Sequence, residues 1–329
     1  MVPQGKAGMP LDAVPADAPF VIVFNAGSGR GDSEAARAAI ERVLSEAGRR
    51  WRLHAVEHAE QLRSVAARAV AEAREQGGVV VAAGGDGTIN AVAQAALGSG
   101  CPFGVLPQGT FNYFSRSHGI PSDTVEATRL LLNARPSPVQ VGLVNDRVFL
   151  VNASLGLYPQ LLEDREAWKQ QFGRSRLVAL GAGLATLLRW HRQLRLHIEL
   201  PGAVRTIRTP TLFVGNNRLQ LEQIGIEQAR ALEDGRLAAI TLRPVGTPAM
   251  LGLLVRGALG RLGEADQVMS LGFTQMSVRP ALSYGRARVK VATDGEVLWM
   301  RAPLAFRVAP EPLWLLKPEH PTPDGEKVP

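Results

Sequence analysis

The chain has 329 residues, 46% apolar and 20% charged, which is typical of a soluble globular protein long enough for two domains. Lysine and arginine outnumber aspartate and glutamate by 37 to 30, and the net charge of +7 favours anionic partners. Only three tyrosines are present and no basic run alternates with aromatic residues, so we expect no nucleic-acid partner. The lone Cys101 excludes a disulfide framework and fits a reducing cytoplasm.

The two ends of the chain are rich in proline and polar residues. Residues 1–19 lack the apolar core of a signal peptide and predict a disordered leader, and residues 317–329 predict a disordered tail. The longest apolar run, Leu177–Leu188, is too short to span a bilayer. We therefore expect a protein without a membrane-spanning segment.

Short apolar runs alternate with amphipathic segments over the first third of the chain. The runs predict buried strands at Phe20–Phe24, Trp51–Val56, Val79–Ala83 and Phe103–Leu106. The segments between these runs have the apolar periodicity of amphipathic helices. A later helix is predicted to begin at a capping box of Asp123 and Glu126. This alternation predicts a parallel sheet covered by helices on both faces.

Three of the predicted strands are followed by glycine-rich loops. These loops are Asn25–Gly29, Gly84–Thr88 and Gly109–Asn112. In an open parallel sheet they share the edge at which ligands bind, and the start of a helix attracts phosphate. Asp86 would repel a bare phosphate, so its presence indicates a nucleotide carried with magnesium. A plain strand-to-helix turn with Asp86 as the N-cap is the alternative.

The pattern changes after Pro136–Pro138. A hairpin is predicted at Val139–Val144 and Arg147–Asn152, and later strands are expected at Leu194–Leu200, Thr211–Gly215, Leu237–Arg243 and Ala287–Thr293. Short strands joined by turns predict an antiparallel β-rich domain. We thus expect an α/β domain over residues 20–137 and a β-rich domain over residues 138–316, whose final segment packs back on the first domain.

The glycine loops, taken together and in order, resemble the catalytic domain of the diacylglycerol kinase family, specifically the soluble bacterial lipid kinases related to sphingosine and ceramide kinases. The matching stretches are Asn25–Gly29, Gly84–Asn90, Gly109–Asn112, Asn152–Gly156, Leu232–Leu237 and Asp294–Glu296. The likeness extends from Phe20 to about Phe306. The second stretch is less specific by itself, because NAD kinases and phosphofructokinases look similar there.

The resemblance implies that ATP and Mg²⁺ are bound by the first domain and a lipid by the second. The residues it implies for the nucleotide are Asn25, Ser28, Gly29, Gly84, Gly85, Asp86, Gly87, Thr88, Ile89, Asn90, Gly109, Thr110 and Asn112. Asp86 is implied to carry the magnesium of ATP. A second, structural magnesium is implied at Asp234 with the main-chain carbonyls of Ala231 and Arg236, and Glu296 is implied as the general base.

Several positions depart from the family pattern. Ala91 stands where many relatives have glutamate, Phe111 replaces a glycine, Tyr113 replaces an aspartate, and Ala26 replaces a proline. Phe111 would narrow the nucleotide pocket or stack on a base. Because Asp86, Asp234 and Glu296 are all present, we expect an active enzyme.

Two stretches have the composition of a membrane-surface contact. Arg174–Arg195 is apolar in the middle, basic at both ends and carries Trp190, although a buried core helix explains this pattern equally well; Met250–Leu262 is the second such stretch. We expect peripheral association with an anionic membrane surface at the cytoplasmic face. His54 and His58 are four residues apart but lie at a strand end, which argues against a metal pair.

The sequence thus favours an ATP-dependent lipid kinase that phosphorylates a hydroxyl of a diacylglycerol-like or sphingoid lipid. One alternative is a small-molecule kinase similar to NAD kinase. The other is a non-catalytic nucleotide or lipid sensor, suggested by Ala91 and Tyr113.

Overall fold

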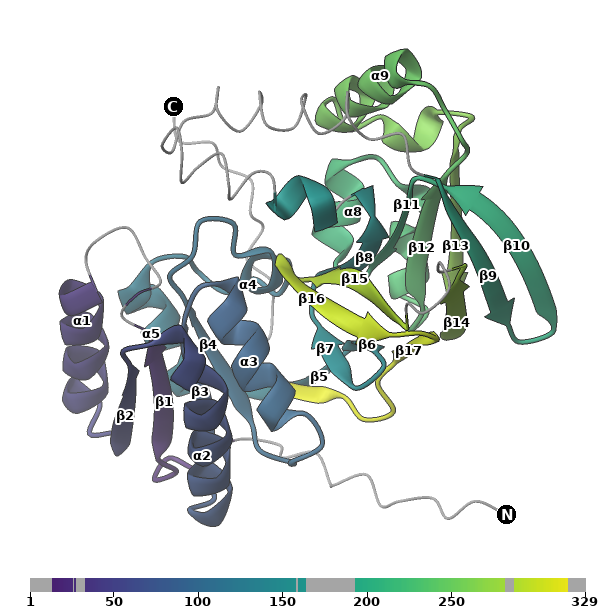
Figure 1. Cartoon of the computed structure of the whole chain (residues 1–329). Helices are drawn as coiled ribbons and strands as arrows, with labels where there is room; N and C mark the ends of the chain where they lie inside the picture. Colours follow the sequence, from purple (N-terminus) through teal and green to yellow (C-terminus); the bar gives the residue numbers. More distant parts are fainter. Residues whose placement is uncertain are drawn as a thin grey trace. The chain divides into compact units, whose positions relative to one another are not determined.

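The computed structural model describes residues 14–25, 27, 33–157, 159–163, 193–281 and 287–318. The chain forms two compact units, one of residues 1–141 with 309–329 and the other of residues 142–308 (Figure 1). The division after Val141 lies a few residues beyond the prolines at which a boundary was predicted. Each unit is described by itself below.

The first unit is built on a six-stranded sheet in the order β2-β1-β3-β4-β18-β5. Its strands are β1 (Phe20–Asn25), β2 (Trp51–Val56), β3 (Val79–Gly84), β4 (Phe103–Pro107), β5 (Arg135–Val139) and β18 (Leu313–Lys317). All neighbours pair in parallel except β5, which runs antiparallel to β18. Strand β3 is buried along its whole length, as its unbroken apolar sequence predicts. The predicted parallel sheet is confirmed.

Helices cover both faces of this sheet. They are α1 (Ser33–Glu46), α2 (Leu62–Glu75), α3 (Asp86–Ala96), α4 (Tyr113–Ser117) and α5 (Thr124–Asn133), with a short 3₁₀ turn, η1 (Ala59–Gln61), before α2. Helix α1 packs against α5, and α2 packs against α3. Right-handed crossovers place these two pairs on opposite faces, because the chain moves from β1 to β2 in one direction and from β2 to β3 in the other. The predicted cap of α5 is present, since Asp123 accepts a hydrogen bond from the Glu126 amide.

Part of the predicted leader is ordered. The Arg49 guanidinium donates hydrogen bonds to the carbonyl oxygens of Pro15, Ala16 and Ala18 at 2.7, 2.5 and 3.2 Å. The expected disorder is therefore wrong for residues 14–19, because an arginine with several donors holds their backbone; residues 1–13 lie outside the described residues. The predicted tail is also wrong at its first residue, since Lys317 pairs with Arg135 as the last residue of β18.

The second unit is a sandwich of two antiparallel sheets. One has the order β10-β9-β14-β17-β6-β7 and the other β13-β12-β11-β8-β15-β16. The first sheet contains β6 (Gly142–Val144), β7 (Arg147–Phe149), β9 (Leu194–Leu200), β10 (Ala203–Thr209), β14 (Gln275–Pro280) and β17 (Leu304–Val308). The second contains β8 (Asn152–Gly156), β11 (Thr211–Gly215), β12 (Leu237–Leu242), β13 (Val268–Phe273), β15 (Arg288–Thr293) and β16 (Glu296–Arg301). The predicted antiparallel β-rich region is confirmed.

The core of this unit lies between its sheets. Buried side chains of β9 and β17, such as Ile198 and Phe306, belong to one cluster with Leu155 of β8 and Leu212 of β11. The outer face of the second sheet is covered by α8 (Arg218–Gln223) and the 3₁₀ segment η2 (Glu227–Leu232). Helix α9 (Thr247–Ala258), followed by η3 (Leu262–Glu264), packs on a smaller cluster.

One predicted hairpin differs from the structure. Strands β6 and β7 form the hairpin, but Asn152 begins β8, which pairs with β11 and β15 in the other sheet. The chain crosses between sheets at Leu150 and Val151, which a continuous apolar run does not reveal. Among the described residues, no helix combines the length and apolarity needed to span a membrane.

Candidate functional site

The three glycine-rich loops of the first unit meet at the carboxyl ends of its strands. The Asn25 side chain at the end of β1 donates a hydrogen bond of 3.0 Å to the Thr88 hydroxyl in α3. The backbone N–H of Gln108, just after β4, donates a hydrogen bond of 2.8 Å to the carbonyl oxygen of Gly84, the last residue of β3. These bonds join all three loops, so the convergence that the sheet topology predicted is present.

The loops approach so closely that glycine is required at their contact. A Cβ atom placed on Gly109 would lie 3.1 Å from the Gly85 Cα atom and 2.7 Å from Asn112 Oδ1. Either distance is shorter than ordinary van der Waals contact. Gly109 and Gly85 therefore let two backbone segments form one surface, which larger side chains would separate.

The surface ends at the N-terminus of α3. The N-cap is Gly85, so no capping side chain covers this helix end, and Asp86 is the first helical residue. This corrects the alternative in which Asp86 is the N-cap. A Cβ atom on Gly87 would have no atom within 4 Å, so open space adjoins the first turn. A helix start with small residues and open space suits a phosphate group.

Some of the other residues predicted to bind the nucleotide are exposed at the loops, and others are buried in the core of the first unit. Thr110 is exposed at the tip of its loop, whereas Thr88 is 2% exposed and Ile89 is fully buried. Ile89 therefore packs in the core, and only its backbone remains for a ligand. Asn90 is 9% exposed. Two further predicted residues, Ser28 and Gly29, lie outside the described residues.

Asn112 shapes its loop through its own side chain. Its Oδ1 accepts a hydrogen bond from the Gly109 amide, and its Nδ2 donates one to the Gly109 carbonyl oxygen, both at 3.0 Å. Its φ of 47° lies in the left-handed region, which asparagine tolerates better than most residues. The structure thus gives Asn112 a positioning role, which the sequence pattern alone did not distinguish from ligand contact.

The two aromatic residues that depart from the family pattern contact each other. The rings of Phe111 and Tyr113 are stacked, with centroids 5.9 Å apart and planes 3° apart. Phe111 is 48% exposed. The stack places an aromatic surface on the loop that carries Thr110.

The predicted general base lies in the second unit. Glu296 begins β16, its side chain is 54% exposed, and one carboxylate oxygen lies 3.4 Å from Nη2 of Arg147. The side chain is thus open to solvent on one side and held by a cation on the other. The contact of Arg147 with Glu296 was not predicted, because nothing in the sequence around this arginine, which follows an Asn-Asp turn, indicates a distant partner.

The neighbouring Asp294 has a structural role that the sequence analysis missed. Its carboxylate accepts hydrogen bonds from the amides of Leu150, Val151 and Asn152 at 2.7, 2.9 and 3.0 Å. Its φ of 47° lets the chain turn into Gly295 and then Glu296. The Asp-Gly pair predicts a turn from sequence. The backbone segment that the Asp294 carboxylate binds, however, is about 140 residues away in the chain, so the sequence does not reveal this contact.

The residues predicted for a structural magnesium contact one another. Asp234 Oδ2 accepts a hydrogen bond of 2.7 Å from Arg236, and the Ala231 carbonyl oxygen accepts bonds from the amides of both Asp234 and Arg236. One oxygen of the Asp234 carboxylate therefore contacts a guanidinium, while the side chain remains 65% exposed. A structural magnesium at these residues stays a prediction.

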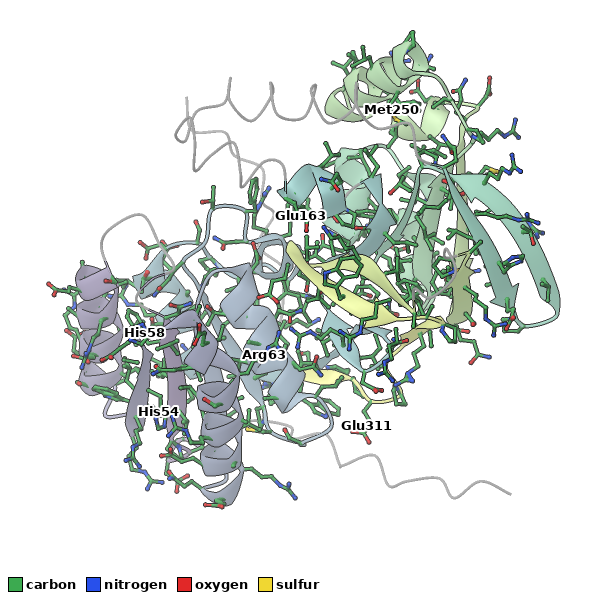
Figure 2. All side chains as sticks on the ribbon, in the orientation of Figure 1. His54, His58, Arg63, Glu163, Met250 and Glu311 are labelled. Carbon is green, nitrogen blue, oxygen red and sulfur yellow. The ribbon has the colours of Figure 1, made fainter. Side chains whose placement is uncertain are left out.

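A histidine pair is likewise not formed by the two residues four apart. His54 lies on β2 and its Nε2 contacts Glu72 Oε2 at 2.8 Å, while His58 lies beyond the strand (Figure 2). Within the described ranges, no group of three or more histidine, cysteine or acidic side chains is placed to hold a metal ion.

The two stretches predicted to contact a membrane surface are only partly included in the described residues. Residues 164–192, which contain nearly all of the first stretch, lie outside the described residues. In the second, Met250 (Figure 2) and Leu253 are buried side chains of α9, whereas Val255 and Leu259 are 60% and 67% exposed. Helix α9 and its C-cap residue therefore combine buried apolar side chains with exposed ones.

Comparisons with known proteins agree with this architecture. Residues 19–144 match the model of the diacylglycerol kinase catalytic domain. A protein of Cronobacter sakazakii named "Probable lipid kinase YegS-like" is 43% identical over 96 residues, which are 28% of this chain and 32% of that protein. A diacylglycerol kinase of Bacillus subtilis is 34% identical over 146 residues, or 44% and 47% of the two chains.

The matched segments thus span less than half the length of these curated relatives. The crystal structure of a diacylglycerol kinase from Bacillus anthracis str. Sterne aligns with a TM-score of 0.65 at 17% identity, over 92% of this chain and 97% of that one. At this identity the likeness shows a shared fold. Residues 19–144 of this chain are therefore similar to the diacylglycerol kinase catalytic domain.

Proposed function

We propose that this protein is an ATP- and magnesium-dependent lipid kinase, which transfers the γ-phosphate of ATP to a hydroxyl of a diacylglycerol-like or sphingoid lipid. The observation that carries the proposal is the meeting of three glycine-rich loops beside α3, within residues that match a kinase catalytic domain. Phosphoryl transfer depends mainly on positioning and on charge stabilisation, and such a loop surface supplies positioning.

The residues of the first unit fit a bound nucleotide. The backbone of residues 84–88 and the exposed Thr110 would hold phosphate oxygens, and Asn25 and Asn112 would keep the loops in place. Bound ATP would supply the phosphoryl group that is transferred. Its magnesium ion would supply positive charge that offsets the negative charge of the phosphates. Asp86, at the first position of α3, is the carboxylate that we propose would hold that magnesium.

Glu296 is the residue we propose to remove the proton from the lipid hydroxyl. A positioned carboxylate contributes about 10²- to 10⁴-fold to the rate of such a step. Arg147 restrains the orientation of the Glu296 carboxylate by its contact of 3.4 Å. Asp294 holds the turn that leads into Glu296.

The test is incubation of the purified protein with labelled ATP, Mg²⁺ and mixed micelles that each contain one lipid class. We expect label in a lipid that carries a free hydroxyl, and its loss in the Asp86→Asn variant. Label in NAD with every lipid unmodified would replace the proposal with an NAD kinase. ATP binding without transfer to any acceptor would replace it with a nucleotide sensor.

A further inference from the structure

The outer face of one sheet in the second unit gathers arginines that have no acidic partner among the described residues. In the register of β9 and β10, Arg195 and Arg208 lie directly opposite each other. In the register of β9 and β14, Arg279 lies opposite His197, one diagonal step from Arg195. All three arginines are exposed, and strands β9, β10 and β14 are neighbours in one sheet (Figure 1). We call these three residues the arginine face.

The side of the sheet on which they lie follows from strand alternation. Leu196 and Ile198 of β9 and Val278 of β14 belong to the sandwich core, so the residues between them point away from it. A hydrogen bond of 2.9 Å between Thr206 and His197 confirms that β10 and β9 share this outer face. The arginine face is therefore on the solvent side.

The charges on this face are not balanced by ion pairs. None of Arg195, Arg208 and Arg279 makes an ion pair within the described part of the chain. Glu199 is the acidic residue on this face of β9, and it lies opposite Val204 and Ser277 rather than an arginine. Like charges directly opposite on neighbouring strands destabilise a sheet, so the arrangement does not serve the stability of the fold.

Val204 adds an apolar group to the same face. It lies on β10 four residues from Arg208, near the β9–β10 turn, and is 74% exposed. Unpaired arginines beside an exposed apolar side chain suit the headgroup layer of a membrane, which accepts both. A surface for single-stranded nucleic acid would add stacking platforms, and no phenylalanine, tyrosine or tryptophan lies on these three strands.

We propose that the arginine face binds the surface of an anionic phospholipid bilayer. The inference rests on the proposed lipid kinase function, since a protein that phosphorylates a lipid must reach the bilayer. The alternative surface, α9, has an exposed apolar pair but less free charge, because Arg261 is paired with Glu264 at 2.9 Å.

The test is sedimentation of the full-length protein, without ATP, with vesicles of phosphatidylcholine alone or with added phosphatidylserine. Each basic side chain near an anionic surface contributes about fivefold to binding, so the triple variant R195Q/R208Q/R279Q should bind the anionic vesicles about 10²-fold more weakly. Binding of the wild type should also fall strongly between about 0.05 and 0.5 M salt. A matched control, R42Q/R68Q/R74Q, removes three exposed arginines from the helices of the first unit and should bind as the wild type does.

A stability measurement separates loss of the surface from loss of the fold. The Arg208→Gln variant should unfold at the same temperature as the wild type or slightly higher, because it removes a like-charge neighbour of Arg195. Undiminished binding of the triple variant, or an equal loss in the control, would overturn the proposal. So would loss of binding confined to V255S/L259S, which would move the contact to α9, or binding of RNA in place of vesicles.

The kinase and membrane proposals fail in different ways. With a short-chain lipid that is dissolved as monomers, the triple variant should phosphorylate as fast as the wild type, while its rate on anionic vesicles falls. Vesicle binding with no phosphorylation of any lipid would overturn the kinase proposal alone. Phosphorylation of vesicle lipids at an unchanged rate by the triple variant would overturn the membrane proposal alone.

Discussion

The side-chain amide of Asn25 and the hydroxyl of Thr88 form a hydrogen bond of 3.0 Å between two loops that are 63 residues apart. Thr88 lies in the first turn of α3 and is almost fully buried. The bond therefore fixes the end of β1 against the helix start that we propose for phosphate binding. Its loss should disturb the nucleotide site more than the fold.

The Thr88→Val variant tests this relationship, since valine keeps the shape of threonine without its hydroxyl. We expect a loss of about 1 kcal/mol in the free energy of unfolding and an increase of about tenfold in the KM for ATP. Thr128→Val is the matched control, because the Thr128 hydroxyl binds the Thr124 carbonyl oxygen within α5. An equal rise of KM in both variants would show that the Asn25–Thr88 bond has no special role.

Two glycine substitutions should separate binding from folding. A methyl group on Gly87 meets open space, so Gly87→Ala should leave the melting temperature unchanged or higher, yet weaken ATP binding about tenfold by occupying the proposed phosphate space. A methyl group on Gly109 meets Asn112 and Gly85, so Gly109→Ala should lower the melting temperature. Calorimetric titration with ATP and thermal unfolding measure both effects. Unchanged ATP affinity in Gly87→Ala would remove this turn from the site.

The Glu296→Gln variant should lower kcat about 10²-fold or more while the KM for ATP stays unchanged, because glutamine cannot accept the hydroxyl proton. Glu163→Gln is the control, since Glu163 is also a partly exposed, ion-paired carboxylate of the second unit, bound to Lys290 at 2.7 Å (Figure 2). Its kcat should equal that of the wild type. Full turnover in Glu296→Gln would assign the proton transfer to another residue.

Asp294 should matter for stability in proportion to its backbone contacts. The Asp294→Asn variant places an amide where three N–H donors converge, and we expect a loss of about 2–3 kcal/mol in the free energy of unfolding. Asp146→Asn, at the fully exposed turn of the β6–β7 hairpin, should change it by less than about 0.5 kcal/mol. Urea unfolding compares the two, and equal losses would show that the three bonds contribute little.

Local sequence pattern predicted the elements that depend on local properties. The unbroken apolar run at residues 79–83 predicted a buried strand, and the glycine loops predicted the edge where ligands bind. Strand β10 was missed because an edge strand with the sequence AVRTIRT buries little and shows no clear alternation. Strand β18 was not delimited because its partners, β4 and β5, are about 180 to 210 residues away in sequence.

The same distinction applies to the candidate site. Residue types and their order indicated Gly109 and Asp86, but not which side chains serve the loop itself. The hydrogen bonds of Asn112 to Gly109 and of Asp294 to distant amides are pairings that only the fold brings together. The ion pair of Asp234 with Arg236 is local, yet the family pattern favoured a metal there.

His118 predicts how the stability of the protein depends on pH. Burial and the nearby Lys317 ammonium lower the pKa of His118 from 6.5 to about 4, and its ring lies edge-on to Phe114 at 4.8 Å. Between these two pH values the unfolded chain binds a proton that the folded protein does not. The contribution of His118 to the free energy of unfolding should therefore be fully present above pH 6.5 and fall by on the order of 3 kcal/mol as the pH decreases to about 4.

The His118→Gln variant isolates this contribution, because glutamine is neutral at every pH in the window. Its free energy of unfolding should change less between pH 6.5 and 4 than that of the wild type, whatever its absolute stability. His58→Gln, which replaces an exposed histidine (Figure 2), should retain the wild-type slope. Urea unfolding at several pH values gives the comparison. If the wild type and His118→Gln lose stability equally on acidification, another group that titrates in this window is responsible for the loss, because glutamine at this position binds no proton.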